Sequence, residues 1–303
     1  MSIQYRTSVP ATTANLGPGY DILGLALDLR LTALAVPADE WIVEPQGEGS
    51  HLLDTCGYNL IAQAFEEACK RHGWDVYPLR IESDNQIPIA RGLGSSAAAI
   101  VTGMALAQLV KLGRLDRDAL FRDAADMEGH PDNVAAAVYG GLQEVSKQGP
   151  GCQVRTKDLS DSVKVMLVIP DQMKSTKELR EIVPERLSAE DQAANEGALK
   201  HVLQGLAEGD AVHLRFSESD RRHQPYRLAV QPTSAAIFRL LQEHPAIAGV
   251  FLSGAGTTVG GWIAGEADPR TEIREALREQ SITAAVMLTE PDREGTQGEV
   301  IRG

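Results

Sequence analysis

The sequence predicts a two-domain protein of the α+β class, with a single large domain as the alternative. Its 303 residues exceed what one hydrophobic core usually holds, so two domains of roughly 150 residues each are expected. Strand-like and helix-like segments occur in both halves of the chain. The composition changes at residues 146–151, a stretch with Gly and Pro, which is the best boundary signal. We place the division near residue 155, between an N-terminal domain over 1–155 and a C-terminal domain over 156–303.

The first half begins with two predicted strands, at 3–9 and 25–36. They flank a long loop over 10–21, where Pro and Gly residues interrupt regular structure. Apolar residues recur at helical spacing over 59–72, and Gly73 follows where a left-handed residue commonly ends a helix. The other elements expected here are a strand over 79–82, a small-residue helix ending at Leu112, a helix from Asp116 towards Glu128, and an Ala-rich turn from Val134 to Gly140.

The second half has its own set of elements. Residues 163–169 form a near-continuous apolar strand, and Ser188 with Asp191 resembles a capping box that opens a helix to about Ala207. The elements expected next are a helix over 235–242, a glycine-rich hairpin of 250–252 and 258–264, a helix starting at Pro269, and a strand over 284–288. Residues 298–302 are either a final strand or part of a loose tail.

Composition and charge exclude several classes of function. Hydrophobic residues make up 43% of the chain and charged residues 23%, which is ordinary for a globular protein and argues against disorder. Lys and Arg number 29 against 42 Asp and Glu, a net charge of −13. Such a chain repels a phosphate backbone, so we expect no general binding to nucleic acid or to anionic membranes. Any phosphate that it binds must be held locally.

Cysteine usage and hydropathy favour a cytoplasmic protein. The three cysteines are odd in number, lack C-x-x-C spacing and have no clustered histidines, so neither a disulfide framework nor a zinc site is expected. The N-terminus lacks the order of a signal peptide, and the longest apolar stretch, 97–110, is too short to span a bilayer. Six histidines, His223 among them, fit no metal-ligand spacing and are interpreted as surface or packing residues.

Residues 88–98, with the sequence Pro-Ile-Ala-Arg-Gly-Leu-Gly-Ser-Ser-Ala-Ala, carry the sharpest functional signal. Gly92 and Gly94 allow a tight turn and close approach to a ligand, and the amides that follow lie at a helix N-terminus, which favours an anion such as a di- or triphosphate. Ser95 and Ser96 add hydroxyls that could donate to phosphate or ligate magnesium. The loop lacks the Gly-Lys-Ser/Thr of a Walker A motif and the third glycine of a dinucleotide fingerprint. Tight strand–helix packing without a ligand is the alternative.

Residues 127–133, Met-Glu-Gly-His-Pro-Asp-Asn, gather two carboxylates, an imidazole and an amide across a turn. Magnesium bound to nucleotide phosphates takes one or two carboxylates, so either Glu128 or Asp132 could be its ligand. The alternative is helix capping by Asp132 or Asn133.

Two further glycine-containing stretches are candidates for ligand contact. In residues 12–21, Asn15 and Asp21 supply an amide and an anion suited to a polar or zwitterionic substrate, although Asx-turns explain them equally well. Residues 252–259, Leu-Ser-Gly-Ala-Gly-Thr-Thr-Val, permit close backbone approach, as would a bulged hairpin that binds nothing.

Together these stretches resemble the GHMP family of small-molecule kinases. The N-terminal Pro-Ala-Thr-Thr-Ala-Asn-Leu-Gly-Pro-Gly-Tyr-Asp, the 88–98 loop and the Ser-Gly-Ala-Gly-Thr-Thr near the C-terminus occur in the family's order and span nearly the whole chain. Residues 128–133, 175–180 and 224–227 are similar to stretches of the homoserine kinases within that family. One departure is Thr257, where the family more often has proline.

The resemblance implies an N-terminal domain with the ribosomal protein S5 domain 2-like fold and a C-terminal ferredoxin-like domain, with ATP and substrate between them. Asn59 would lie by the adenine, while Ser96 and Glu128 would hold Mg²⁺. The implied nucleotide-binding residues of the central loop are Pro88, Arg91, Gly92, Leu93, Gly94, Ser95, Ser96 and Ala97.

For the substrate, the resemblance implies L-homoserine, phosphorylated on its hydroxyl in threonine biosynthesis. Asp132, Asn15 and Asp21 would receive the ammonium group, and Arg180 and Arg227 would bind the carboxylate. His130 and Asn133 would position the hydroxyl, so that Asn133, Asp132 and Arg180 are the implied catalytic residues. Either Asp132 or the γ-phosphate accepts the hydroxyl proton, and the sequence leaves both routes open.

The resemblance also implies a homodimer, while cysteine usage and net charge predict a cytoplasmic protein that binds neither nucleic acid nor membrane. Two other functions stay open at this stage. One is a GHMP kinase for another small alcohol, and the other is an ATP-binding sensor without catalysis.

Overall fold

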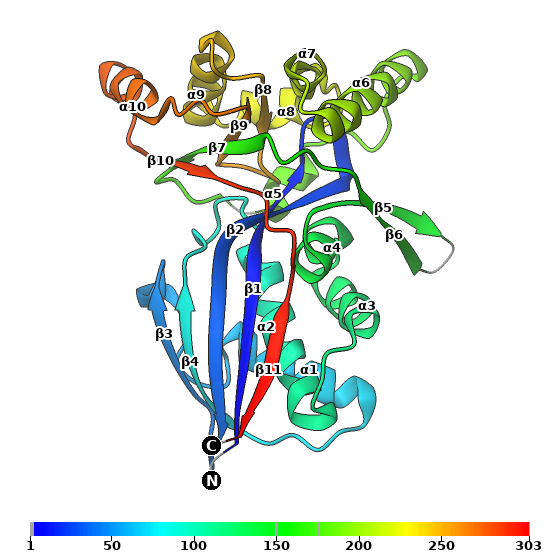
Figure 1. The fold of residues 1–303 in the computed structure, drawn as a ribbon, viewed down its shortest axis with the longest axis vertical. Helices are drawn as coiled ribbons and strands as arrows, with labels where there is room; N and C mark the ends of the chain where they lie inside the picture. The colour runs from blue at the N-terminus through cyan, green and yellow to red at the C-terminus, as the bar shows by residue number, and fades with distance from the viewer. Residues whose placement is uncertain (1–2, 149–150, 175, 303) are drawn as a thin grey trace.

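A computed structural model describes residues 3–148, 151–174 and 176–302. Two β-sheets form the framework, each with helices packed against it (Figure 1). The first sheet is long and carries helices α1 to α4, and the second is shorter and carries helices α6 to α10 (Figure 1). The α+β class predicted from the sequence is confirmed.

The first sheet has seven strands in the order β11-β1-β2-β4-β3, with a β5–β6 hairpin that pairs with β2. All neighbouring pairs are antiparallel except β3 with β4. Its strands are β1 (Ile3–Asn15), β2 (Gly19–Pro37), β3 (Ile42–Gly47), β4 (Leu79–Asn85), β5 (Leu142–Gln148), β6 (Gly151–Lys157) and β11 (Gln297–Arg302).

The loop predicted over 10–21 is wrong, because β1 continues to Asn15 and β2 begins at Gly19. Register shifts at Pro10/Ala11 and Ala14/Asn15 allow the irregular residues to stay paired with β2. Proline has no N–H to donate within a sheet, but a bulge can accommodate it. The prediction treated Pro10 as the end of the strand and therefore placed a loop here.

The helices of the first half follow their sequence signals. They are α1 (Leu60–His72), α2 (Ser95–Leu112), α3 (Arg117–Glu128) and α4 (Pro131–Tyr139), with a short 3₁₀ turn at Ser50–Leu52. The side chains of Asn59 and Asp116 cap α1 and α3, and the predicted Gly73 ends α1 in the left-handed conformation. The helix α4 begins three residues before the predicted Val134, because Pro131 suits the first helical turn.

Helix α2 has 18 residues, so by length and composition alone it could cross a membrane, contrary to the expectation from residues 97–110. However, 67% of it is buried inside the protein, where it packs on α1 and β1. Most residues of α2 belong to the hydrophobic core, so the apolar composition of this helix fits a buried core helix.

The second sheet has four antiparallel strands in the order β10-β7-β9-β8. They are β7 (Val163–Pro170), β8 (Gly249–Leu252), β9 (Val259–Ala264) and β10 (Ala284–Thr289). The associated helices are α5 (Thr176–Glu181), α6 (Ala189–Glu208), α7 (Ala211–Leu214), α8 (Gln224–Ala229), α9 (Pro232–Glu243) and α10 (Arg270–Glu279), with a 3₁₀ turn at Arg215–Ser219. The predicted helix after Ser188 is confirmed, and Ser188 caps it.

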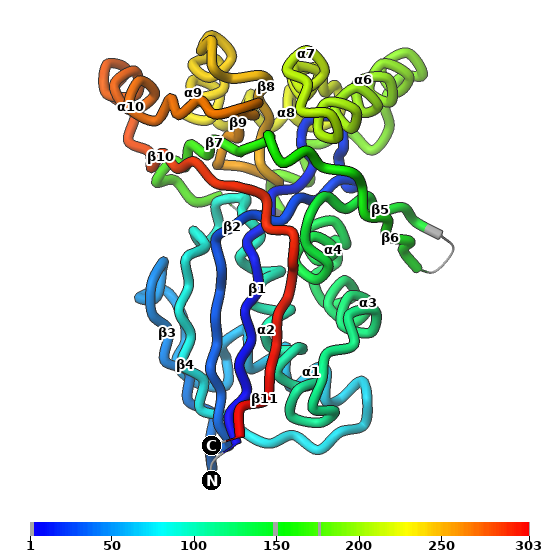
Figure 2. Tube along the Cα trace, in the orientation of Figure 1, coloured from blue at the N-terminus to red at the C-terminus, as the bar shows by residue number. Residues whose placement is uncertain are grey.

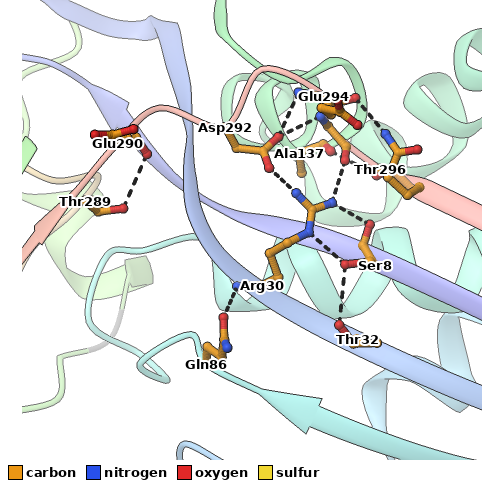
Figure 3. Close-up of polar contacts among 12 residues, drawn as sticks. Ser8, Arg30, Thr32, Gln86, Ala137, Thr289, Glu290, Asp292, Glu294 and Thr296 are labelled. Carbon is orange, nitrogen blue, oxygen red and sulfur yellow. Dashed lines mark hydrogen bonds and ion pairs between the residues drawn. The ribbon is translucent and has the colours of Figure 1, made fainter. Parts of the chain in front are cut away.

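The C-terminal segment returns from β10 to the first sheet, where β11 pairs with β1 (Figure 2). Of the two alternatives for residues 298–302, the final strand is therefore confirmed. An ion pair between Arg30 and Asp292 fixes this crossing (Figure 3). The Arg30 guanidinium also donates to the Ser8 carbonyl at 2.9 Å and the Gly295 carbonyl at 2.7 Å.

The sheets do not divide the chain at a single point. The predicted division near 155 falls within β6, which pairs with β5 in the first sheet, and β11 belongs to that sheet although it lies at the C-terminus. Within the boundary stretch 146–151, Gly149 and Pro150 lie outside the described residues. The exact domain boundary stays a prediction.

Candidate active site

Elements of both sheets line one cavity of about 410 Å³. The start of α2, the α3–α4 turn and the end of β1 form part of its wall, together with α5, α8 and the β8–β9 loop. Residues of β2, β4 and the start of α1 also line it. Most of the predicted site residues line it: Asn15, Asn59, Gly92, Gly94, Ser95, Ser96, Glu128, His130, Asp132, Asn133, Arg180 and Arg227. Residues that are distant in sequence therefore converge on one space.

One end of the cavity is built like a phosphate cradle. Helix α2 begins at Ser95, directly after Gly94, whose backbone is left-handed with φ 68°. Glycine has no side chain to cap the helix, so the first amide N–H groups of α2 remain available to a ligand. The positive end of the helix dipole adds to the attraction for an anion.

The third glycine-containing motif holds this loop in place. The Ser253 hydroxyl donates to the Gly92 carbonyl at 2.6 Å, and the Thr258 amide donates to the Arg91 carbonyl at 3.2 Å. A Cβ atom on Gly92 would lie 2.3 Å from the Ser253 carbonyl oxygen. Gly92 is therefore required for close packing between the two loops, which was the alternative explanation for this glycine. The same packing also holds the loop that leads into the first amides of α2. The Thr257 hydroxyl, at the position where proline is usual, donates to the Gln172 carbonyl at 2.8 Å.

Ser96 and Glu128 fit a magnesium ion. The Ser96 hydroxyl donates to Glu128 Oε2 at 2.8 Å, beside the free amides of α2. Burial raises the pKa of Glu128 and outweighs the Ser96 hydrogen bond and the Arg180 charge, which both lower it. Hydroxyl and carboxylate oxygens are the ligands that Mg²⁺ prefers. Asp132, the other carboxylate considered for the ion, instead accepts the Asn133 amide at 2.8 Å.

The turn between α3 and α4 brings three polar side chains into the cavity. His130 occupies the N-cap of α4, so the alternative that Asp132 or Asn133 caps this helix is wrong. Asn133 Oδ1 accepts the Thr12 hydroxyl at 2.8 Å, which fixes its amide. Asp132 is 2% exposed, and burial, followed by the nearby Asp21 charge, raises the pKa of Asp132 to about 6. Burial, followed by the nearby Arg180 cation, lowers the pKa of His130, which favours the neutral imidazole.

Two arginines, Arg180 and Arg227, line the same cavity. Arg180 donates to both carboxylate oxygens of Asp21, at 2.7 and 3.2 Å. Burial opposes the charge of Arg180, but the contact with Asp21 outweighs it and raises the pKa of Arg180. The Arg180 Nε atom is buried and has no hydrogen-bond partner among the described residues. An anionic ligand would supply that partner.

Asn15 also lines the cavity, and two hydrogen bonds hold its side chain. Its Nδ2 donates to the Gly254 carbonyl at 2.8 Å and its Oδ1 accepts the Asp21 amide at 3.1 Å. The Asp21 amide is six residues away in sequence, so this contact is not the Asx-turn considered as the alternative. Asp21 does not line the cavity itself and contacts it through Arg180.

Four predicted nucleotide-binding residues direct no side chain into the cavity. Leu93 and Ala97 are buried in the core, and Pro88 lies outside the cavity lining. The Arg91 guanidinium donates to the carbonyls of Pro170 and Asp171, at 2.8 and 2.6 Å, at the end of β7. Any contact of these residues with a nucleotide would come from the backbone. Ser175, in the predicted 175–180 stretch, lies outside the described residues.

Sequence reasoning missed the apolar wall of the cavity. Leu31, Leu53, Leu60, Ile61 and Ile89 line it near Asn59, which caps α1 with its side chain. These residues belong to no motif. Hydrophobic periodicity predicts that they are buried, but it does not distinguish a cavity wall from the rest of the core. Lys174 was also missed, because a single exposed lysine beside a motif gives no distinct signal.

Comparison with known proteins agrees with this geometry. Family models for the GHMP kinases N terminal domain and the GHMP kinases C terminal match residues 59–141 and 196–282. A homoserine kinase of Thermus thermophilus is 39% identical over 274 residues, which cover 90% of this chain and 92% of that protein.

Solved structures share the fold. A crystal structure of homoserine kinase from Cytophaga hutchinsonii has a TM-score of 0.84 at 22% identity and covers 98% of this chain and 97% of its own. The mevalonate kinase of Methanococcus jannaschii has a TM-score of 0.74 at 16% identity, covering 94% of this chain and 98% of its own. Since kinases of two substrates share the architecture, the fold alone does not define the acceptor.

The two-domain architecture and the cradle at α2 define a kinase of the GHMP class, as the resemblance predicts. The extent of the sequence identity narrows this class, and the chain belongs to the homoserine kinase family.

Proposed function

We propose that this protein transfers the γ-phosphoryl group of ATP to the hydroxyl of L-homoserine, forming O-phospho-L-homoserine and ADP. The observation that carries the proposal is the polarity of one cavity. Its lining combines uncapped helix amides with two arginines and the buried Asp132, and a further carboxylate, Asp21, pairs with Arg180 behind the lining. A polyphosphate and a small zwitterion need complementary charges in this arrangement.

In this proposal the triphosphate binds the first amides of α2, and the adenine lies against the apolar wall next to Asn59. Ser96 and Glu128 hold Mg²⁺, which when bound offsets the negative charge of the phosphates. Because the protein has a net charge of −13, these local groups must overcome a repulsive background.

Homoserine then binds with its carboxylate on Arg180 and Arg227. Its ammonium group lies near Asp132, Asn15 and Asp21. The substrate must replace part of the Asp21–Arg180 contact, because each of its charges competes with one partner of that ion pair. A ligand with only one of the two charges would leave a partner unpaired, which penalises it.

The chemistry requires alignment more than a dedicated base. Phosphoryl transfer passes through a loose transition state, so positioning and charge stabilisation supply most of the rate. His130 and Asn133 orient the hydroxyl, and the bond from Thr12 holds Asn133 in place. The hydroxyl proton passes to Asp132 if that carboxylate is free, and to the transferred phosphoryl group if Asp132 holds the ammonium.

The cellular setting is part of the same proposal. A kinase of this substrate acts in threonine biosynthesis, in the cytoplasm, where ATP is available. We propose a homodimer that binds neither nucleic acid nor membrane, consistent with the acidic charge of the chain.

A coupled ADP-release assay over homoserine, mevalonate, galactose and shikimate tests the function. We expect turnover with homoserine, and we expect Arg180→Ala and Arg227→Ala each to raise the KM for homoserine by about 100-fold, the value of a lost charged hydrogen bond. Turnover with another alcohol, unaffected by both substitutions, would assign the protein to a different acceptor. Nucleotide binding without turnover of any alcohol would indicate a sensor.

A further inference from the structure

His223 is a fully buried histidine at the start of α8, next to the cavity but outside its lining. Its Nε2 atom lies 2.9 Å from the Gly17 carbonyl oxygen, and its Nδ1 atom lies 3.2 Å from Nη1 of Arg227. The imidazole therefore bridges the turn between β1 and β2 and the arginine proposed to bind the substrate carboxylate.

The two neighbours select one protonation state of this ring. A carbonyl oxygen only accepts, so Nε2 must carry the hydrogen, whereas a guanidinium only donates, so Nδ1 must offer its lone pair. Burial, against the opposing charge of Asp220, lowers the pKa of His223 to about 4, which agrees with a neutral ring. The Asp220 carboxylate lies 3.5 Å from Nε2 and accepts the backbone amides of His223 and Gln224 at 2.9 and 2.7 Å.

Arg227 depends on this contact for its orientation. The Arg227 Nε atom donates to the Leu179 carbonyl at 3.0 Å, and its Nη1 atom donates to the Gly254 carbonyl at 2.9 Å. Among the described residues, His223 is the only side chain that accepts a hydrogen bond from Arg227. No described residue accepts a hydrogen bond from Nη2. The three acceptors thus fix the guanidinium plane and leave one nitrogen for a ligand in the cavity.

The other contact of His223 leads to the opposite end of the substrate site. Gly17 lies in the three-residue turn between Asn15 and Gly19, beside Asn15 and close to Asp21. A Cβ atom on Gly17 would lie 2.2 Å from the Ser217 carbonyl oxygen, so this turn is tightly packed. His223 therefore ties the residues proposed for the ammonium group to the arginine proposed for the carboxylate.

We propose that His223 is a positioning residue, which as the neutral Nε2–H tautomer sets the distance between the ammonium and carboxylate subsites. This proposal rests on the proposed function, since it assumes an amino-acid substrate. Its consequence is selective: loss of the bridge weakens homoserine binding and leaves the nucleotide cradle at α2 unchanged.

Three substitutions separate positioning from packing. His223→Leu still fills the buried space with an apolar side chain but removes both hydrogen bonds. His223→Gln places its acceptor one bond farther along the side chain than Nδ1, so it also mismatches Arg227. His223→Asn places Oδ1 near the position of Nδ1 and keeps the acceptor for Arg227, while losing the contact with Gly17.

Steady-state kinetics with homoserine and ATP varied separately provide the test. We expect H223L and H223Q to raise the KM for homoserine by about 10-fold to 100-fold, as for a lost hydrogen bond to a charged group. The KM for ATP and kcat should change by less than about threefold. H223N keeps only the Arg227 half of the bridge, so its KM for homoserine should lie between those of H223L and the unsubstituted protein. His244→Leu is the matched control, because His244 makes a local bond to the Ala246 amide at the end of α9, and we expect it to change neither KM.

The outcomes separate this proposal from the proposed function. Absence of homoserine turnover in the unsubstituted protein would overturn the function, and this proposal with it. Normal turnover combined with an unchanged homoserine KM in H223L and H223Q would overturn only the positioning role. A parallel rise in both KM values, or a homoserine KM in H223N no lower than in H223L, would reduce His223 to a packing residue. If H223L does not fold, H223Q against H223N decides the question by the same criteria.

Discussion

Substitution of Gly92 by alanine tests whether the loop before α2 is the nucleotide cradle. Gly92 has φ 80°, and a left-handed backbone costs an alanine about 1–2 kcal/mol. The added Cβ would also lie 2.3 Å from the Ser253 carbonyl oxygen and 2.8 Å from that of Gly256, so the two loops must separate. Separation breaks the 2.6 Å bond from Ser253 to Gly92, worth about 1 kcal/mol. We therefore expect the free energy of unfolding to fall by about 3 kcal/mol.

Gly113→Ala is the matched control at the other end of the same helix. Gly113 has φ 70°, and a Cβ atom added there would meet open space within 4 Å, so only the backbone strain of about 1 kcal/mol remains. We expect G92A to raise the KM for ATP at least tenfold because the α2 amides shift, and G113A to leave it unchanged. Denaturant unfolding and ATP kinetics measure the two quantities. A G92A protein that is destabilised but has an unchanged KM for ATP would refute the cradle.

Three further outcomes follow from the same geometry. Asp292→Ala should lower the free energy of unfolding by about 3 kcal/mol through loss of the buried pair with Arg30, with kcat/KM nearly constant; an unchanged denaturation midpoint would contradict this. Asp132, with its pKa raised from 3.8 to about 6, binds more protons in the folded state, so its stabilising contribution is present below pH 3.8 and is lost as pH rises through 6. Relative to Asp132→Asn, the unsubstituted protein should thus lose about 2.5 kcal/mol between pH 4 and 7, and parallel stability curves would argue against that shift. Glu128→Gln should raise the Mg²⁺ concentration for half-maximal activity by about tenfold or more, whereas an unchanged Mg²⁺ titration would exclude it as a ligand.

Local signals predicted the longer helices well, whereas the short helices α5, α7 and α8 were not predicted. Asn59 and Asp116 cap their helices through bonds to amides two or three residues away, and Gly73 ends α1 by its own backbone conformation. Such interactions are contained within a few residues, so the sequence displays them directly. The strands were harder, because β1 extends past Pro10 only through its pairing with β2, and the return of β11 to β1 joins the two ends of the chain. Pairing between distant segments leaves no local signature.

In the candidate site, too, local motifs were visible in the sequence and contacts between distant segments were not. Gly92, Ser96 and Glu128, which motif spacing singled out, line one cavity because their motifs occupy the turns that build it, and their roles there stay predictions. Individual contacts within the site were not predictable. The burial of His223 depends on the packing of the β1–β2 turn against α8, and a histidine outside any ligand pattern gives no sign of that position.

A crystal structure with a non-hydrolysable ATP analogue and homoserine tests the central claim most directly. We predict that the terminal phosphates accept from the first amides of α2, that the homoserine carboxylate contacts Arg180 and Arg227, and that its hydroxyl faces the γ-phosphate. Phosphates bound elsewhere, or a homoserine molecule with its carboxylate directed away from both arginines, would contradict the account.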